Sequence, residues 1–95
     1  MVTIFNSIPS PDGRKLAVIF QVDYGATTPF NRQVSLVPAD RAFSRDRYPS
    51  FLAVRGQRDL DVKWVTDKAI EIDLPEGETI YRNAQTVGDI TIEYK

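Results

Sequence analysis

Residues 61–74 read Asp-Val-Lys-Trp-Val-Thr-Asp-Lys-Ala-Ile-Glu-Ile-Asp-Leu and contain the chain's only tryptophan, Trp64. Apolar and polar residues alternate on both sides of the central Thr66-Asp67-Lys68, and a period of two is typical of a β-strand with one buried face. A short Asp side chain can bond its own backbone and tolerates left-handed dihedral angles, so this central segment is expected to form the turn. The pattern predicts a β-hairpin with Trp64 as the core anchor on its apolar face.

A hairpin alone is only marginally stable in water, so its apolar face needs further strands. Residues 16–22 supply one, in which Val18 and Phe20 on one face alternate with Ala17 and Ile19 on the other. Because both faces are partly apolar, this strand is expected at the centre of a sheet or covered on both sides. Further strands are expected at residues 33–37, 51–54, 79–82 and 90–94, and residues 2–8 form another apolar segment.

About six to seven short strands separated by turn residues predict an all-β fold. The expected architecture is a small antiparallel sheet, a sandwich or a half-open barrel, with at most one short helical turn at residues 40–45. Val, Ile and Thr outnumber Leu and Ala by 24 to 12, a composition that favours pleated sheet over helix. At 95 residues the chain is expected to form a single domain spanning residues 1–95.

Cysteine and histidine are both absent from the chain. Their absence removes disulfides, thiolate nucleophiles, the usual general base at neutral pH and the commonest metal ligand. No Ser-x-x-Lys or comparable pairing of nucleophile and base is present. Asp59 and Asp61 lie on one side of an extended segment, but calcium takes about six to eight oxygen ligands. We therefore expect a non-catalytic protein with no cofactor and no metal.

The sequence also bears on the compartment. No apolar run approaches the roughly 20 residues that a membrane-spanning helix requires. The first residues lack the basic start of a signal peptide. The chain as written is therefore expected in the cytoplasm, or in the cell envelope if an export segment has been removed.

Four short motifs follow one another along the chain: Ser10-Pro11-Asp12-Gly13, Gly25-Ala26-Thr27-Thr28, Gln33-Val34-Ser35, and Trp64 with Asp67. In this order they resemble a family of small bacterial proteins of unknown function, whose members are often exported or lipid-anchored. The resemblance covers about three-quarters of the chain and implies a bacterial origin and support for the β fold, but no activity. Two positions depart from the family pattern, because Tyr24 stands where a Cys often occurs and Pro29 where a Gly does.

Two of these motifs have further interpretations. The Ser-Pro-Asp-Gly turn is also similar to the turn that opens a blade of a β-propeller, but one copy excludes a propeller within this chain. Residues 25–28 offer unhindered amides and two hydroxyls, which suit an anion. They lack the Gly-Lys-Thr ending and the following helix of a phosphate-binding loop, so a plain strand connection is the better interpretation.

Charge is distributed unevenly along the chain. Residues 32–58 carry six arginines against two aspartates, whereas residues 59–95 carry four basic against nine acidic side chains. The arginines stand among Phe43, Tyr48 and Phe51, and such a mixture can hold phosphates and stack bases. A pI of 5.3 argues against a nucleic-acid binder, and the acidic tail can neutralise the basic segment internally. The candidate residues for binding an anion or a partner are Arg41, Arg45, Arg47, Tyr48, Arg55 and Arg58.

The leading interpretation is a small bacterial β domain that acts as a protein-interaction or structural module. Its expected contact surfaces are a sheet edge, which offers unpaired backbone groups, or the long segment at residues 39–57. Outward-facing apolar residues suggest that a second sheet or another subunit covers the other face: Ala17, Ile19, Val37 and Val65. The expected partner is an unknown protein or a second copy of the chain. The alternative is binding of nucleic acid or another polyanion through residues 41–58.

Overall fold

The computed structural model describes residues 2–23, 30–56, 60–74 and 76–95. These residues form nine β-strands and no helix, which confirms the prediction of an all-β fold. The strands are β1 (Val2–Pro9), β2 (Lys15–Val22), β3 (Asn31–Pro38), β4 (Leu52–Arg55), β5 (Asp61–Thr66), β6 (Ala69–Asp73), β7 (Ile80–Asn83), β8 (Thr86–Val87) and β9 (Ile90–Tyr94). Nothing in these described ranges forms a helix long and apolar enough to cross a membrane.

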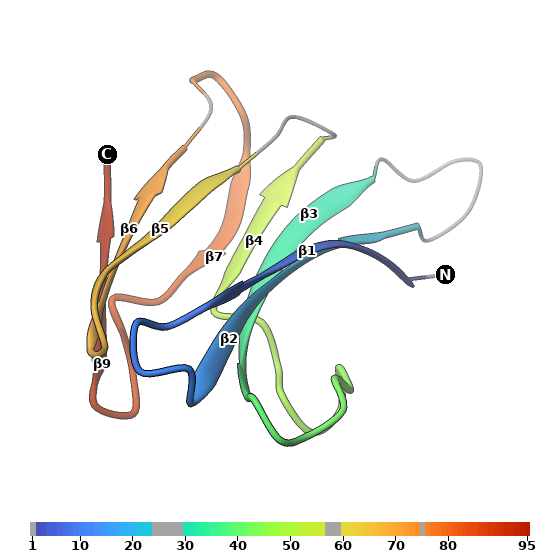
Figure 1. Cartoon of the computed structure of the whole chain (residues 1–95). Coiled ribbons are helices and arrows are strands. Elements are labelled where there is room, and N and C mark those ends of the chain that lie inside the picture. Colours follow the sequence, from blue (N-terminus) through green and yellow to red (C-terminus); the bar gives the residue numbers. More distant parts are fainter. Residues whose placement is uncertain (1, 24–29, 57–59, 75) are drawn as a thin grey trace.

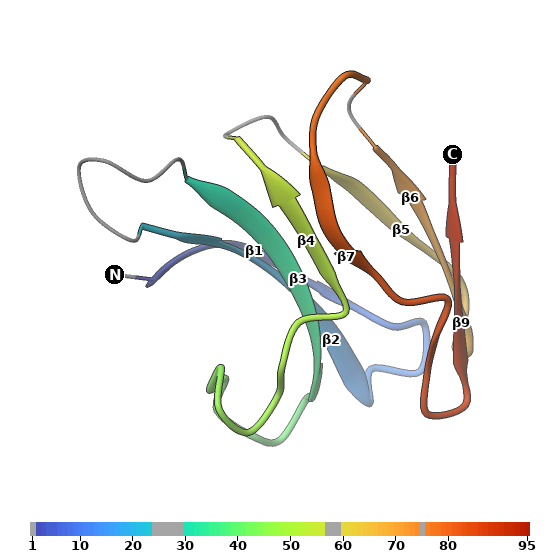
Figure 2. The same cartoon turned by 180° about the vertical axis from the view of Figure 1, so that it is seen from behind.

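The strands are arranged in two sheets. Sheet A has the order β1-β2-β3-β4-β7, and sheet B has the order β5-β6-β9-β8. Figures 1 and 2 show sheet B lying across one face of sheet A, so that the domain is a small sandwich. We call the face of sheet A that points toward sheet B the inner face, and the opposite face the outer face.

The hairpin predicted at residues 61–74 is present as β5 and β6. Val62 pairs with Ile72 and both are buried, whereas the pair of Lys63 and Glu71 points the other way. The predicted alternation is therefore confirmed. The turn falls at Asp67 and Lys68, between the two strands.

The Asp67 carboxylate has a different role from the one expected. Its Oδ1 accepts a hydrogen bond from the backbone N–H of Asp12, 2.8 Å away, and the turn's own N–H of Lys68 is bound by Thr66 Oγ1 instead. No described residue other than glycine has a positive φ, so Asp67 does not adopt the left-handed conformation. The carboxylate joins the hairpin turn to the Ser-Pro-Asp-Gly turn between β1 and β2.

Trp64 is half-buried at the margin of the core and ties the two sheets together. Its ring packs against the main core, and its Nε1–H donates to the carbonyl oxygen of Ile8 at 2.8 Å. Ile8 belongs to β1 of sheet A, whereas Trp64 belongs to β5 of sheet B. The expected core anchor is therefore also a hydrogen-bonded link between two neighbouring strands of different sheets.

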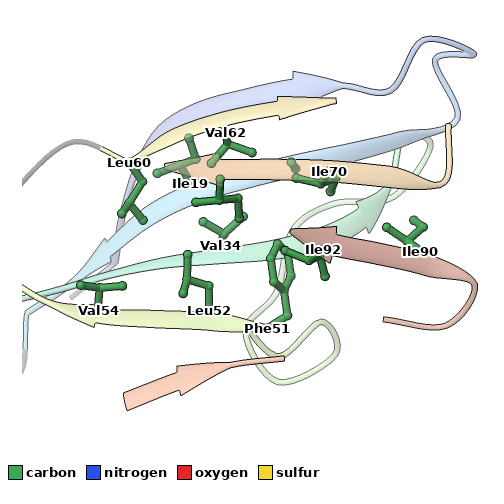
Figure 3. Packing of buried hydrophobic residues seen from close by; sticks show 12 residues of the cluster. Ile19, Val34, Phe51, Leu52, Val54, Leu60, Val62, Ile70, Ile90 and Ile92 are labelled. Atoms are coloured by element: carbon green, nitrogen blue, oxygen red, sulfur yellow. The ribbon is translucent and has the colours of Figure 1, made fainter. Parts of the chain in front are cut away.

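The main core lies between the inner face of sheet A and sheet B (Figure 3). Sheet A contributes Ile19, Val34 and Leu52 from its three central strands, and sheet B contributes Ile70 and Ile92. All five side chains are buried. Burial of this apolar area is the main term that holds the two sheets together.

The outer face of sheet A is covered by residues 39–50, which we call the cover loop. It leaves β3 and returns to β4 on the side of sheet A away from sheet B (Figure 1). Phe43 of this loop packs on Phe20 of β2, with ring centroids 4.8 Å apart and planes tilted by 48°. Tyr48 packs on the same small cluster. β2 is thus covered on both faces, as its sequence predicts.

Internal packing changes the interpretation of the outward-facing apolar residues. Ala17 and Ile19 are buried against sheet B, and Val37 is buried beneath the cover loop. Of the four residues that suggested a cover supplied by another subunit, only Val65 is exposed. The chain itself supplies the cover for the other three.

Two details of the topology differ from what the sequence predicts. β9 runs parallel to β6, because the chain leaves sheet B after β6, adds β7 to the edge of sheet A and then re-enters sheet B. β8 lies where a loop was expected at residues 83–88, and it pairs with β9 across a tight turn. Gly88 has a φ of +62° in that turn, a conformation that side chains disfavour. The helical turn considered at residues 40–45 is not formed.

Candidate functional site

The candidate arginines are separated into two groups. Arg41, Arg45 and Arg47 are all exposed and share the cover loop, where Asp46 stands between the last two. Arg55 is exposed at the end of β4. Arg58 lies outside the described residues. The structure therefore brings three of the five predicted arginines onto one loop of mixed charge.

The aromatic rings among these arginines are already engaged within the domain. Phe43 and Tyr48 pack on the outer face of sheet A, and Phe51 is buried in the main core. A ring that stacks a nucleobase must present a free face to the base. Phe43 and Tyr48 instead attach the cover loop to the sheet. Among the described residues of that hypothesis, the exposed ones are the arginines Arg41, Arg45, Arg47 and Arg55.

A row of polar side chains lies on the outer face of β3. Asn31, Gln33 and Ser35 pair across the sheet with Val22, Phe20 and Val18, respectively. Residues paired in an antiparallel ladder share a face, so all three polar side chains point toward the outer side. All three are buried, which is unusual for amide and hydroxyl groups unless they are hydrogen-bonded.

Two atoms of this polar row have no hydrogen-bond partner among the described residues. They are Oδ1 of Asn31 and Oγ of Ser35. Ser35 is completely buried, whereas Asn31 lines an open groove between the cover loop and β7. The groove has a volume of about 610 Å³, and its other lining residues include Gln33, Arg45, Asp46, Tyr81 and Arg82.

The groove was not predicted from the sequence, although its polar residues are visible there. Gln33 and Ser35 occupy alternate positions of the strand predicted at residues 33–37, a pattern normally assigned to a solvent-facing side, whereas Asn31 lay outside the predicted strand. The rest of the groove comes from the cover loop and from β7, which are brought beside β3 only by the fold. Arg45 is the one predicted site residue that lines it.

The edge strand β1 exposes an apolar surface. Val2, Ile4 and Phe5 are among the few large apolar side chains exposed in the described part of the chain. Among the described strands of sheet A, β1 pairs with β2 alone, and a bulge at Phe5 interrupts the register. The guanidinium of Arg32 lies 4.0 Å from the centroid of the Phe5 ring. The free part of this edge is residues 2–5, because Trp64 occupies the other end at Ile8.

The turn motifs of the family resemblance lie next to each other. Asp12 accepts hydrogen bonds from the Ser10 hydroxyl at 2.6 Å and from the Arg14 backbone N–H at 3.0 Å. The first of these bonds is the main cause that holds the pKa of the Asp12 carboxyl below its usual range. Asp67 binds the same turn from sheet B. The carboxylates of Asp12 and Asp67 thus both bind groups of these two turns, which indicates a structural role.

The remaining candidates from the sequence are the possible metal ligands and residues 25–28. Within the described ranges, no three of the residue types His, Cys, Asp and Glu gather as metal ligands. Residues 25–28 and Asp59 lie outside the described residues. Comparisons with protein-family models, with curated proteins and with solved structures gave no match.

Proposed function

We propose that this domain is a non-catalytic interaction module that pairs with a second copy of itself through the free edge of β1. The observation that carries the proposal is the exposure of Val2, Ile4 and Phe5 on a strand whose other side has no neighbour in sheet A. An exposed apolar edge strand offers both backbone hydrogen bonds and apolar surface to another strand.

The composition of β1 supports pairing between identical strands. Residues 2–9 contain no charged side chain, whereas natural edge strands that resist pairing commonly carry lysine or another charge. Two copies of β1 related by a two-fold axis would be antiparallel. Because the strand has no charged side chain, no like charges would oppose each other across the pair. Val2 and Ile4 of the two copies would then lie close together.

The geometry also sets the strength of the contact. The bulge at Phe5 and the bond from Trp64 to Ile8 restrict regular pairing to the first residues of β1. A contact of this size falls in the class of small, transient interfaces, well below the roughly 1,200 Å² of a stable complex. We therefore expect weak association that depends on protein concentration.

Sedimentation velocity over a range of concentrations up to about 1 mM tests the proposal. The wild-type protein should associate, and Ile4→Lys should remain monomeric because a lysine on an edge strand opposes pairing. Val65→Lys is the matched control, since Val65 is 51% exposed on a strand of sheet B and Ile4 is 53% exposed. A monomeric wild-type protein, or an equal effect of both lysines, would contradict the proposal.

A further inference from the structure

The groove on the outer face of sheet A has the features of a small-molecule site. Its base is formed by Phe20, Asn31, Gln33 and Ala53, which come from three adjacent strands. One wall is the cover loop, and the other is β7 with Arg82. The volume of about 610 Å³ lies within the range of roughly 300–1,000 Å³ found for ligand pockets.

The two walls are connected to each other. Nη1 of Arg82 donates a hydrogen bond to the carbonyl oxygen of Ser50, 2.9 Å away, where the cover loop ends. Phe43 attaches the same loop to Phe20. The groove is therefore bounded by segments that are held in place on both sides, as a preorganised site requires.

The unpartnered carbonyl of Asn31 is the observation that points to a ligand. Asn31 is 8% exposed, and its Oδ1 has no partner in the described part of the chain although the residue lines the groove. A buried acceptor without a donor costs free energy, and such groups in native structures call for a specific explanation. Oδ1 itself has less than 1 Å² of exposed surface, so a ligand that donates an O–H or N–H to it would remove this cost once the Asn31 side chain turns toward the groove.

The charges around the groove exclude a simple anion as the best occupant. Arg45 and Arg82 provide positive charge, but Asp46 lies on the same groove with a carboxylate. An anion has no donor for Asn31 Oδ1 and would be repelled by Asp46. A neutral ligand with several hydroxyls can donate to the carbonyl and the carboxylate and can also accept from the guanidinium groups.

We propose that this groove binds a neutral saccharide, a function that goes beyond the association through β1. Tyr81 supports this ligand class, because its ring is 57% exposed and lines the groove beside the polar groups. A sugar ring has an apolar C–H face that packs on an aromatic ring while its hydroxyls reach polar partners. Asn31 and Gln33 fix the orientation from below, and Arg45 and Asp46 contact the ligand from the cover loop.

Titration of the labelled protein by NMR tests this proposal directly. The probes are cellotriose, maltotriose and N,N′-diacetylchitobiose, each added to about 10 mM. At least one should shift the side-chain amide signals of Asn31 and Gln33. The indole signal of Trp64 should stay in place, because Trp64 is bound to Ile8 between the sheets. Absence of these shifts with all three probes would overturn the proposal.

Substitutions separate binding from folding. Asn31→Leu and Tyr81→Ala should each weaken binding by about tenfold, the loss expected for one hydrogen bond or one ring contact. Val65→Ala shortens an exposed apolar side chain on sheet B, which contributes no residue to the groove, and should leave binding unchanged. Inorganic pyrophosphate is the competing probe. Shifts caused by pyrophosphate and not by the saccharides would assign the groove to anions and overturn the proposal.

Discussion

Phe43→Ala tests whether the cover loop is part of the folded core. The Phe43 ring packs on Phe20, which is only 1% exposed, and truncation would open the small cluster on the outer face of sheet A. Truncation of a fully buried Phe costs about 3–5 kcal/mol, and the aromatic pair contributes about 0.5–1.5 kcal/mol. Because Phe43 is only half-buried, we expect a loss of about 2 kcal/mol in the free energy of unfolding.

Urea denaturation followed by Trp64 fluorescence measures this loss, and a thermal melt should show a decrease of about 10 °C for a domain of this size. Tyr81→Ala is the control, because Tyr81 is an exposed ring near the same face and its removal should cost less than about 0.5 kcal/mol. An effect of Phe43→Ala as small as that of the control would refute the packing. Its ring would then be free to contact a partner.

Three further changes have defined outcomes. Trp64→Phe should lower the free energy of unfolding by about 1 kcal/mol in urea denaturation, since the bond to the Ile8 carbonyl is lost; no change would show that the bond is dispensable. Burial raises the pKa of Tyr94 to about 12, so its contribution to stability is complete below the unfolded value near 10 and is lost as the pH rises toward 12. Tyr94→Phe should therefore flatten the decline of the melting temperature between these pH values, and an unchanged decline would contradict the assignment. Asn31→Leu should keep or raise the melting temperature, because it removes an unpartnered buried carbonyl; a loss above about 1 kcal/mol would show that Asn31 is needed for folding.

The alternation of apolar residues was sufficient to predict the local elements. Residues 61–74 follow a period of two, and β5 and β6 form the expected hairpin with Val62 and Ile72 buried. The apolar character of both faces of β2 correctly indicated a covered central strand. These predictions succeed because burial of alternate side chains is a local property of the sequence.

Neither the order of the strands nor the position of the groove could be predicted from the sequence, because both depend on contacts between distant residues. The parallel pairing of β6 with β9 follows from the excursion of β7 into sheet A, which no local pattern encodes. The same holds for the link between Asp67 and Asp12. Residues 41–58 were predicted as a possible binding segment, but Phe43 and Tyr48 of this segment pack inward on the sheet. Composition alone does not determine whether such rings are buried or exposed.

The most direct test of the proposed function is hydrogen exchange of the backbone amides of residues 2–5 at low and high protein concentration. Association through β1 predicts that the outward-pointing amides of this segment exchange more slowly as concentration rises. The amides of β7, at the opposite edge of sheet A, should exchange at the same rate throughout. Exchange at residues 2–5 that is independent of concentration, or slowed equally in β7, would contradict pairing of this edge with a second copy.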